Sequence, residues 1–545
     1  MPYGNCAYAL DIVSEIRGDE DCLIQGGRRI SWRNAQRRAG NLASWMQQRG
    51  VSPQGKVSLY TYNHPAYMEG LYAAFKSALV PVNVNYRYRA EEIGYLLENS
   101  DTEIVVVHED FASLLAEVLP RLPKVVGVLV VKERGCFDMA SISCAADYET
   151  VAETDREPVE VEHSLDDLLL LYTGGTTGMP KGVMWRQEDM FGLFLTRIGG
   201  PSVTEAVYRE ALQAPARTRT LVCPPLMHGT GWISSMVTWF GGGAIVMMGG
   251  TKKFDPAELW RTVAAEKITS ITIVGDSFAK PMLRELQRDK SEYDLSSLEI
   301  IGSSGVMWSE ETKQGLLSYN KGMMLIDSFS SSEALGMGMS ITTAEGSVQT
   351  GKFQLSKTTR LFSDRLELLD SKPGVKGLVG VSGSQPVGYY KDPDKSARTF
   401  VECEAGRFSI PGDWAVVNDD GVTLSLLGRG SVCINTGGEK VFPEEVEEVI
   451  KRFEGVADAV CVGVPDERWG EAITAVVSSH ADEQGIDLDV AALIAHVKEH
   501  LAGYKAPKHV VQVEKVYRSP SGKADFRRTR QTAMEHLGIH EQAQN

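Results

Sequence analysis

The first 160 residues alternate between helix-like and strand-like stretches, and this alternation limits the folds open to the chain. Residues 28–50 predict an amphipathic helix, because their apolar side chains recur near one face. Strands are predicted at 56–62 and 102–107, and the same alternation returns within 270–304. Strands that alternate with helices in this way indicate parallel sheets covered by helices.

The pattern changes after about residue 360 to short strands separated by glycine and proline turns, which indicates a small β-rich subdomain. Beyond Arg429 a further block of helices and strands is large enough for its own α+β core. The glycine-rich string GRGSVCINTGG lies at the junction and predicts a boundary. We therefore predict an α/β fold with a large N-terminal domain of helix-covered sheets (1–428), a hinge (429–431) and a small C-terminal α+β domain (432–545).

Composition excludes several classes of protein. The formal net charge of −16 disfavours a nucleic-acid or anionic-membrane binder, which needs a basic surface. The eight cysteines are irregularly spaced and form no CxxC pair, so we expect reduced thiols in the cytoplasm rather than disulfides or zinc. The first residues do not combine a basic stretch with an apolar core, so no secretory signal is predicted.

One segment, from Cys223 to Thr251, contains no Lys, Arg, Asp or Glu and is long enough to suggest a membrane span. Prolines at its start and three consecutive glycines, 241–243, interrupt it. We predict a loop, a buried helix, a glycine turn and a buried strand at 244–248, without integral membrane association.

A loop rich in glycine and threonine follows an apolar run that ends at Tyr172. Glycines let backbone N–H groups approach an anion, threonine hydroxyls add donors, and a lysine supplies a compact positive charge. Gly182 follows Lys181, whereas the common P-loop requires Ser or Thr there, so kinase and GTPase classes are disfavoured. The predicted phosphate-binding residues are Thr173, Gly174, Gly175, Thr176, Thr177, Gly178 and Lys181.

With the motifs that follow it in order, this loop resembles the adenylate-forming superfamily, which includes acyl-CoA synthetases, luciferases and peptide-synthetase adenylation domains. The resemblance covers nearly the whole chain. It implies that the loop binds the β and γ phosphates of ATP, with Thr177 beside Mg²⁺. It also implies a mobile C-terminal domain that serves two successive half-reactions.

Two further motifs resemble the acyl and adenine sites of that superfamily. The string PPLMHGTGW places His228 at the family's gate to the acyl channel. The string SSGVMW places Ser304, Gly305 and Val306 against adenine.

The string DSFSSSEALG resembles the family's aromatic–Gly–x–Thr–Glu motif. By this resemblance Phe329 stacks on adenine, Asp327 and Ser332 also contact the nucleotide, and Glu333 binds Mg²⁺, a role suited to a carboxylate beside phosphates. Ser330 replaces the family's usual glycine, and its added Cβ is expected to narrow the adenylate pocket.

The last motifs lie around and beyond the predicted hinge. By resemblance, Asp413 accepts hydrogen bonds from ribose hydroxyls and Arg429 lies near ribose and phosphate. Gly437, Gly438 and Glu439 match the segment that passes the pantetheine arm of coenzyme A. The string YRSPSGKADFRR matches the SGK motif, so Lys523 is the candidate catalytic lysine, although Tyr517 stands where the family usually has proline.

These motifs predict an ATP-dependent, AMP-forming carboxylate–CoA ligase with ATP, Mg²⁺ and coenzyme A as cofactors. Details such as GGEKVFPEEVE resemble bacterial acyl-CoA synthetases for steroid-like, terpenoid-like or fatty acids. The alternatives are a member that only converts preformed acyl-adenylate, an enzyme that loads a separate carrier protein, a luciferase-like monooxygenase and a non-catalytic binding protein. The expected partner is a small carboxylic acid, not nucleic acid, and a homodimer is a candidate assembly.

Replacing the candidate lysine tests its role. We expect Lys523→Ala to lose adenylation by up to about a thousandfold, because a placed cation stabilises the negative charge that develops at the α phosphate. Conversion of supplied acyl-adenylate to acyl-CoA should be retained. Pyrophosphate release and acyl-CoA formation measure the two steps separately, and an equal loss of both would contradict the assignment.

Overall fold

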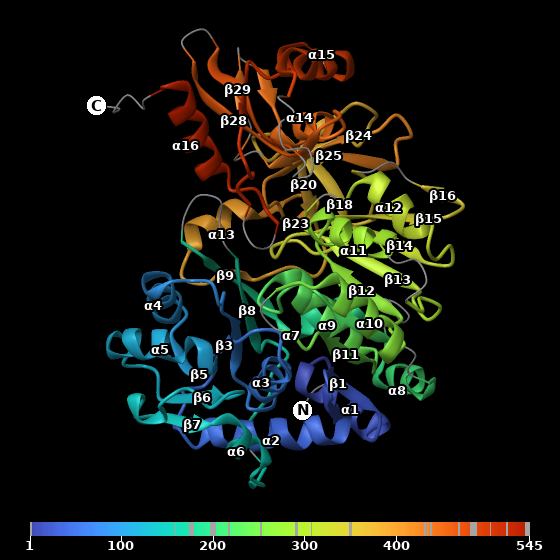
Figure 1. Ribbon diagram of the computed structural model, residues 1–545. Coiled ribbons are helices and arrows are strands. Elements are labelled where there is room, and N and C mark those ends of the chain that lie inside the picture. Colours follow the sequence, from blue (N-terminus) through green and yellow to red (C-terminus); the bar gives the residue numbers. More distant parts are fainter. Residues whose placement is uncertain are drawn as a thin grey trace. The chain divides into compact units, whose positions relative to one another are not determined.

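A computed structural model shows the arrangement of the chain (Figure 1). It describes residues 3–158, 160–173, 179–196, 203–215, 218–250, 253–288, 293–306, 308–347, 351–429, 432, 434–436, 439–466, 469–479, 488–501, 503–518 and 522–539. The chain divides into two compact units. The first comprises Met1–Thr350 and Val381–Ser409, and the second comprises Gly351–Gly380 and Ile410–Asn545.

The first unit contains a sheet in the order β21-β9-β8-β4-β3-β5-β6-β7. Its pairs from β8 to β7 are parallel, whereas β9 pairs antiparallel with both β8 and β21. The strands are β3 (Lys56–Tyr60), β4 (Val80–Asn83), β5 (Thr102–His108), β6 (Gly127–Val131), β7 (Ala145–Asp147), β8 (Leu168–Thr173), β9 (Lys181–Arg186) and β21 (Gly388–Tyr389).

Both faces of this sheet are buried, which explains its nearly continuous apolar strands. Ile104 and Val106 of β5 pack in one core with the first helices, and Val105 and Val107 pack in another core with α4 and α5. The alternation of side chains along a strand thus feeds two separate cores. The helices are α1 (Cys6–Arg17), α2 (Trp32–Gln47), α3 (Pro65–Lys76), α4 (Ala90–Asn99), α5 (Glu109–Val118), α6 (Tyr148–Glu153) and α7 (Gln187–Leu195).

A second sheet of the first unit runs β2-β1-β11-β10-β12-β13-β14-β15-β16, with parallel pairing from β1 to β14. Its strands are β1 (Asp21–Gln25), β2 (Arg28–Ser31), β10 (Arg219–Val222), β11 (Ala244–Met247), β12 (Ser270–Ile273), β13 (Ile300–Ser304), β14 (Met324–Phe329), β15 (Gly338–Thr343) and β16 (Gly346–Ser347). The helices are α8 (Glu205–Gln213), α9 (Gly229–Phe240), α10 (Pro256–Glu266), α11 (Asp276–Arg288) and α12 (Glu310–Leu317). The hairpin β22 (Phe400–Cys403) and β23 (Gly406–Ser409) and helix α13 (Pro393–Thr399) complete this unit.

The second unit combines two β-structures. Antiparallel strands include β17 (Lys352–Leu355), β18 (Thr359–Phe362), β19 (Leu368–Leu369), β20 (Lys376–Val381, with its last residue in the first unit), β24 (Asp413–Val417) and β25 (Thr423–Arg429). A further sheet runs β27-β26-β29-β28, with β30 beside β29. Its strands are β26 (Ile434–Thr436), β27 (Glu439–Val441), β28 (Val456–Asp466), β29 (Gly470–Ser479) and β30 (His509–Gln512), and its helices are α14 (Pro443–Ile450), α15 (Val490–His500) and α16 (Phe526–Leu537).

Most predicted elements are present, with instructive differences. The predicted helix at 28–50 begins only at Trp32, because residues 28–31 form β2, which pairs antiparallel with β1, and Ser31 caps the helix through Asn34 N–H at 3.3 Å. The charge-free segment folds as predicted into α9, a glycine turn and β11. Among the helices that the structure describes, none combines the length and apolarity needed to span a bilayer. Helix α16 was not anticipated.

The division into units differs from the predicted domain limits in one respect. The β-rich strands β17 to β20, β24 and β25 group with the C-terminal helices and sheet rather than with the large N-terminal part. The predicted domain limits therefore stay a prediction of which parts move as rigid bodies during catalysis: 1–428, the hinge 429–431 and 432–545.

Candidate active site

The two ends of the predicted phosphate loop are held together by the β8–β9 hairpin. Thr173, the last residue of β8, lies directly opposite Lys181, the first residue of β9. One residue further on, Tyr172 faces Gly182, and a Cβ at Gly182 would lie 2.7 Å from the tyrosine ring, so glycine is needed there for packing. Gly174, Gly175, Thr176, Thr177 and Gly178 lie outside the described residues.

Lys181 is placed by a segment more than 200 residues further along the chain. Its ammonium forms an ion pair with Asp392, which also caps α13 by accepting a hydrogen bond from the Lys395 N–H at 3.0 Å. This lysine holds the pKa of the Asp392 carboxyl below its usual range. The same ammonium lies 6.0 Å from the ring centroid of Tyr389, within cation–π range.

Glu333 joins the same network through Tyr389. The Tyr389 hydroxyl donates to Glu333 Oε1 at 2.9 Å, and the glutamate side chain is buried. The backbone around it is fixed at two points: Trp185 Nε1 donates to the Ser332 carbonyl at 2.9 Å, and the Ser409 hydroxyl donates to the Glu333 carbonyl at 2.6 Å. The structure therefore brings Lys181 and Glu333 to one tyrosine, with the ammonium over its ring and the carboxylate at its hydroxyl.

His228 and the predicted adenine wall approach this network from two neighbouring loops. His228 is the N-cap residue of α9 and is half-buried. A Cβ at Gly229 would lie 3.6 Å from Ser332 Oγ, and a Cβ at Gly305 would lie 3.8 Å from Thr230 Oγ1. The start of α9 thus lies between the Ser332 loop and the loop that begins after β13.

Ser304 and Val306 stand on either side of Gly305. The Ser304 hydroxyl donates to the Ser328 carbonyl at 2.8 Å, which fixes the end of β13 against β14. The Val306 side chain is half-buried beside a core that includes Ile301 and Leu325 of these two strands. Gly305 has a φ of +91°, a left-handed conformation that favours glycine. The loop is therefore anchored at its first residue and turns sharply at its second.

The residues of the string DSFSSSEALG lie in two environments: Asp327 and Phe329 are buried, whereas the Ser330 hydroxyl bonds within its own loop. Asp327 is buried with its carboxylate 3.4 Å from the ammonium of Lys313, and burial raises the pKa of Asp327 to about 6. Phe329, two residues on, is also buried at the end of β14. Ser330 directs its hydroxyl back into its own loop, where it accepts a hydrogen bond from the Gly336 N–H at 3.0 Å.

An asparagine that the sequence reading did not single out connects the phosphate loop to the gate. Asn83 ends β4, and its amide donates to the carbonyls of Tyr172 at 2.9 Å and Met227 at 2.5 Å. Its side-chain oxygen accepts from the Tyr172 N–H at 2.6 Å. Because Met227 precedes His228, this one buried amide fixes the end of β8 and the gate turn together.

In the second unit, β24 pairs with β25 so that Asp413 lies directly opposite Arg429. The pairing brings the predicted ribose-binding residues together, although the structure does not describe the Arg429 side chain. Next to this pair, Glu444 of α14 packs against Gly428. Burial, and the nearby Glu447 and Asp413 carboxylates, raise the pKa of Glu444.

Lys523 lies, exposed, in a short loop before α16. An isolated β-bridge joins Arg518 to Ala524, and the Arg518 guanidinium forms an ion pair with Asp458 at 2.5 Å. Tyr517, which replaces the family's proline, packs beneath Arg528, whose guanidinium carbon lies 4.1 Å from the ring centroid. The loop that carries Lys523 is thus braced on both sides.

The predicted pantetheine segment is only partly described. β26 pairs with β27 so that Thr436 lies opposite Glu439. Gly437 and Gly438 lie outside the described residues, as does the Glu439 side chain.

Comparison with known proteins identifies the group to which these motifs belong. The pattern of the AMP-binding enzyme family matches residues 12–390, and that of the AMP-binding enzyme C-terminal domain matches residues 445–523. The chain belongs to the AMP-binding enzyme family. The predicted adenylate-forming superfamily is confirmed.

Two relatives place the chain among the acyl-CoA ligases of this family. The medium-chain acyl-CoA ligase Mig of Mycobacterium avium is 36% identical over 541 residues, which cover 95% of this chain and 96% of the relative. The 3-oxocholest-4-en-26-oate–CoA ligase of Rhodococcus rhodochrous is 36% identical over 531 residues, which cover 95% and 93%. The predicted enzyme class, an ATP-dependent acid–CoA ligase, is confirmed.

A solved structure supports the fold. The anthranilate CoA ligase AuaEII in complex with anthranoyl-AMP superposes with a TM-score of 0.82 at 20% identity, covering 99% of both chains. The predicted α/β fold with a large N-terminal and a small C-terminal part is confirmed.

Sequence reasoning missed three residues that orient the candidate site of this AMP-binding enzyme. Asp392 carried a usable signal, since an aspartate before a proline is a typical helix N-cap. Tyr389 and Asn83 carried none, because their partners lie far away in sequence.

The Asn83 clamp is testable. Asn83→Ala removes the hydrogen-bond partner of two buried carbonyls and one buried N–H. Each buried group left unpaired lowers the free energy of unfolding by roughly 1–3 kcal/mol. We expect a lower melting temperature and slower ATP-dependent pyrophosphate release. Asn85→Ala is the matched control, because the contacts of Asn85 are local: its Oδ1 accepts from the Arg87 N–H, and its side chain interacts with Tyr88. Equal behaviour of the two variants would argue against the clamp.

Proposed function

We propose that this acyl-CoA ligase activates a bulky or long apolar carboxylic acid, with Mg²⁺ and with the residues described above in the roles that the family resemblance gives them. The observation that carries the proposal is the link through Tyr389, which sets a phosphate-type cation, Lys181, and a buried carboxylate, Glu333, beside one ring. A triphosphate with its metal requires such a pair of opposite charges close together.

The environment of Glu333 fits a hard cation. The Tyr389 hydroxyl donates to Glu333 Oε1, and within the described part of the chain Glu333 Oε2 has no hydrogen-bond partner. A buried carboxylate oriented through one oxygen leaves the other for Mg²⁺, which binds few carboxylates together with substrate phosphates. When bound, Mg²⁺ would neutralise phosphate charge; the second predicted metal residue, Thr177, stays a prediction.

The family resemblance gives each of these residues a part in the reaction. Lys181 and the loop after Thr173 would bind phosphates, Ser304 to Val306 and Phe329 would hold adenine, and His228 would border the acyl channel. Asp413 and Arg429 would bind ribose, and Lys523 would stabilise charge at the α phosphate while the carboxylate displaces pyrophosphate. Rotation about the hinge 429–431 then presents the segment around Gly438 and Glu439 to coenzyme A.

The acid class is supported by the surface of α9. After His228, the half-buried residues of this helix are Gly229, Thr230, Ile233, Ser234 and Val237, and the other described positions of the helix are buried. Thr230, Ile233, Ser234 and Val237 recur at helical spacing and form one stripe without charge. An uncharged stripe beside the gate suits an apolar acyl group, in agreement with the relatives named for medium-chain and steroid acids.

The same proposal includes a cytoplasmic enzyme that does not bind nucleic acid, in keeping with the net charge of −16. A homodimer stays a prediction.

A substrate panel tests the proposal. The protein is mixed with MgATP and medium-chain, long-chain, steroid and aromatic acids, with and without coenzyme A. Pyrophosphate and acyl-CoA, followed by mass spectrometry, should both form with the bulky or long acids. Activity confined to small aromatic acids would contradict the proposed acid class. Acyl-CoA obtained only from supplied acyl-adenylates would instead establish the single half-reaction.

The Tyr389 link gives a separate prediction. Tyr389→Phe removes the hydroxyl that orients Glu333, and loss of such an outer contact typically lowers metal affinity or activity by about 10–100-fold. We expect the Mg²⁺ concentration for half-maximal pyrophosphate release to rise accordingly. Tyr390→Phe is the control, since that hydroxyl donates to Asp101 at 2.7 Å. Unchanged Mg²⁺ dependence in a folded Tyr389→Phe would disprove the link.

A further inference from the structure

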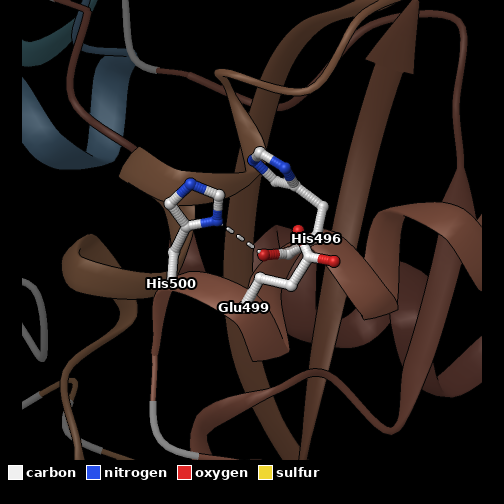
Figure 2. A group of neighbouring side chains, drawn as sticks. All are labelled: His496, Glu499 and His500. Carbon is white, nitrogen blue, oxygen red and sulfur yellow. Dashed lines mark hydrogen bonds between the residues drawn. The ribbon is translucent and has the colours of Figure 1, made fainter.

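The end of helix α15 gathers three side chains of metal-binding type. His496, Glu499 and His500 are spaced i, i+3 and i+4, so they share one face of the helix. One candidate ligand atom from each lies within 4.8 Å of the others, and the two imidazole centroids are 4.4 Å apart. Figure 2 shows the three side chains at this end of the helix.

Each imidazole is already oriented by a backbone carbonyl. His496 Nε2 lies 3.2 Å from the Val449 carbonyl oxygen, and His500 Nδ1 lies 2.8 Å from the His496 carbonyl oxygen, the bond drawn in Figure 2. A carbonyl oxygen can only accept, so these ring nitrogens carry the proton. In the neutral rings His496 Nδ1 and His500 Nε2 therefore hold the lone pairs. Histidines that bind metals are typically fixed in this way, with the second nitrogen bonded to a carbonyl or carboxylate.

The surroundings also favour a cation. The helix C-terminus carries a partial negative charge, and Glu499 adds a full one. His496 is half-buried, whereas Glu499 and His500 are exposed, so an ion would be reached from solvent and could keep water ligands. Simple capping of the helix by two histidines explains the bond of each ring to a carbonyl, but it does not require the carboxylate beside them.

We propose that His496, Glu499 and His500 form a binding site for a divalent transition-metal ion such as Zn²⁺ or Ni²⁺. Imidazole nitrogens select these ions, whereas Mg²⁺ and Ca²⁺ prefer sites made of oxygen. Two histidines at i and i+4 are also the ligand spacing of zinc-binding helices. The site lies in the second unit and shares no residue with the proposed nucleotide site.

An ion at this site would reinforce an existing contact between two helices. Val449 belongs to the last turn of α14, and its carbonyl is bonded to His496. Metal on His496 Nδ1 would fix the ring that makes this bond, while metal on His500 would tie the last turn of α15. Binding should raise the thermal stability of the protein, because a ligand that binds the folded state alone stabilises it.

Calorimetric titration tests the proposal on full-length protein that carries no histidine tag and has been dialysed against a chelator. Zn²⁺, and separately Ni²⁺, should bind with one ion per chain and raise the melting temperature. His496→Ala and His500→Ala should each weaken binding by more than about tenfold, and Glu499→Gln by a smaller factor. His509→Ala, at the start of β30, is the matched control and should bind like the unchanged protein.

A variant that lacks both histidines tests whether the ion binds at this site or elsewhere on the protein. Circular dichroism first establishes that the protein with both His496→Ala and His500→Ala is folded. Loss of stoichiometric binding in that variant would confirm the assignment. Binding of unchanged affinity in it, or no stoichiometric binding by the unchanged protein, would overturn the proposal.

Discussion

The antiparallel pairing of β8 with β9 is the constraint on which the candidate site depends. It brings the two ends of the predicted phosphate loop together, because Thr173 and Lys181 face each other across the hairpin. The remaining sheet beyond β8 is parallel, so this hairpin is the place where the chain reverses beside the carboxyl ends of β8 and β4. Asn83, at the carboxyl end of β4, then bonds to Tyr172 near the end of β8 and to Met227, which precedes the predicted gate residue His228.

A second constraint comes from the segment that contains Tyr389 and Asp392. Its short strand β21 pairs with β9, which carries Tyr389 to the side of Lys181. The Lys181 ammonium lies over this ring, and the Tyr389 hydroxyl donates to Glu333. Asp392 forms an ion pair with Lys181 while it caps α13. Phosphate binding would have to compete with that ion pair. Since the Asp392 carboxylate is stabilised by the lysine, it stays charged near neutral pH, and the competition is between two anions for one cation.

Features of the fold that depend on local sequence pattern could be predicted from the sequence, whereas features that depend on contacts between distant residues could not. The apolar run before Thr173 and the alternation of helices and strands predicted the parallel sheets, and the glycines at 241–243 predicted the turn between α9 and β11. Residues 28–31 were misjudged because RRIS is compatible with both states, and only the pairing with β1 decides for a strand. No local pattern shows that Tyr389 reaches Glu333 or that Asn83 reaches Met227, since each pair is separated by more than fifty residues.

Two departures from the family pattern are absorbed by local contacts. Tyr517 packs beneath Arg528, and the Ser330 hydroxyl bonds to Gly336 within its own loop. The polar atom of Ser330 is thus used locally, and what a nucleotide would meet is its Cβ. ATP, the substrate of the first half-reaction, and the acyl-adenylate, the substrate of the second, contain the same AMP moiety. A narrower adenine pocket would therefore hinder both half-reactions alike. A specialist for the second step would instead dispense with Glu333 and Lys523, the residues that the family resemblance assigns to adenylation, and this chain has both. The physical argument therefore favours the complete two-step ligase.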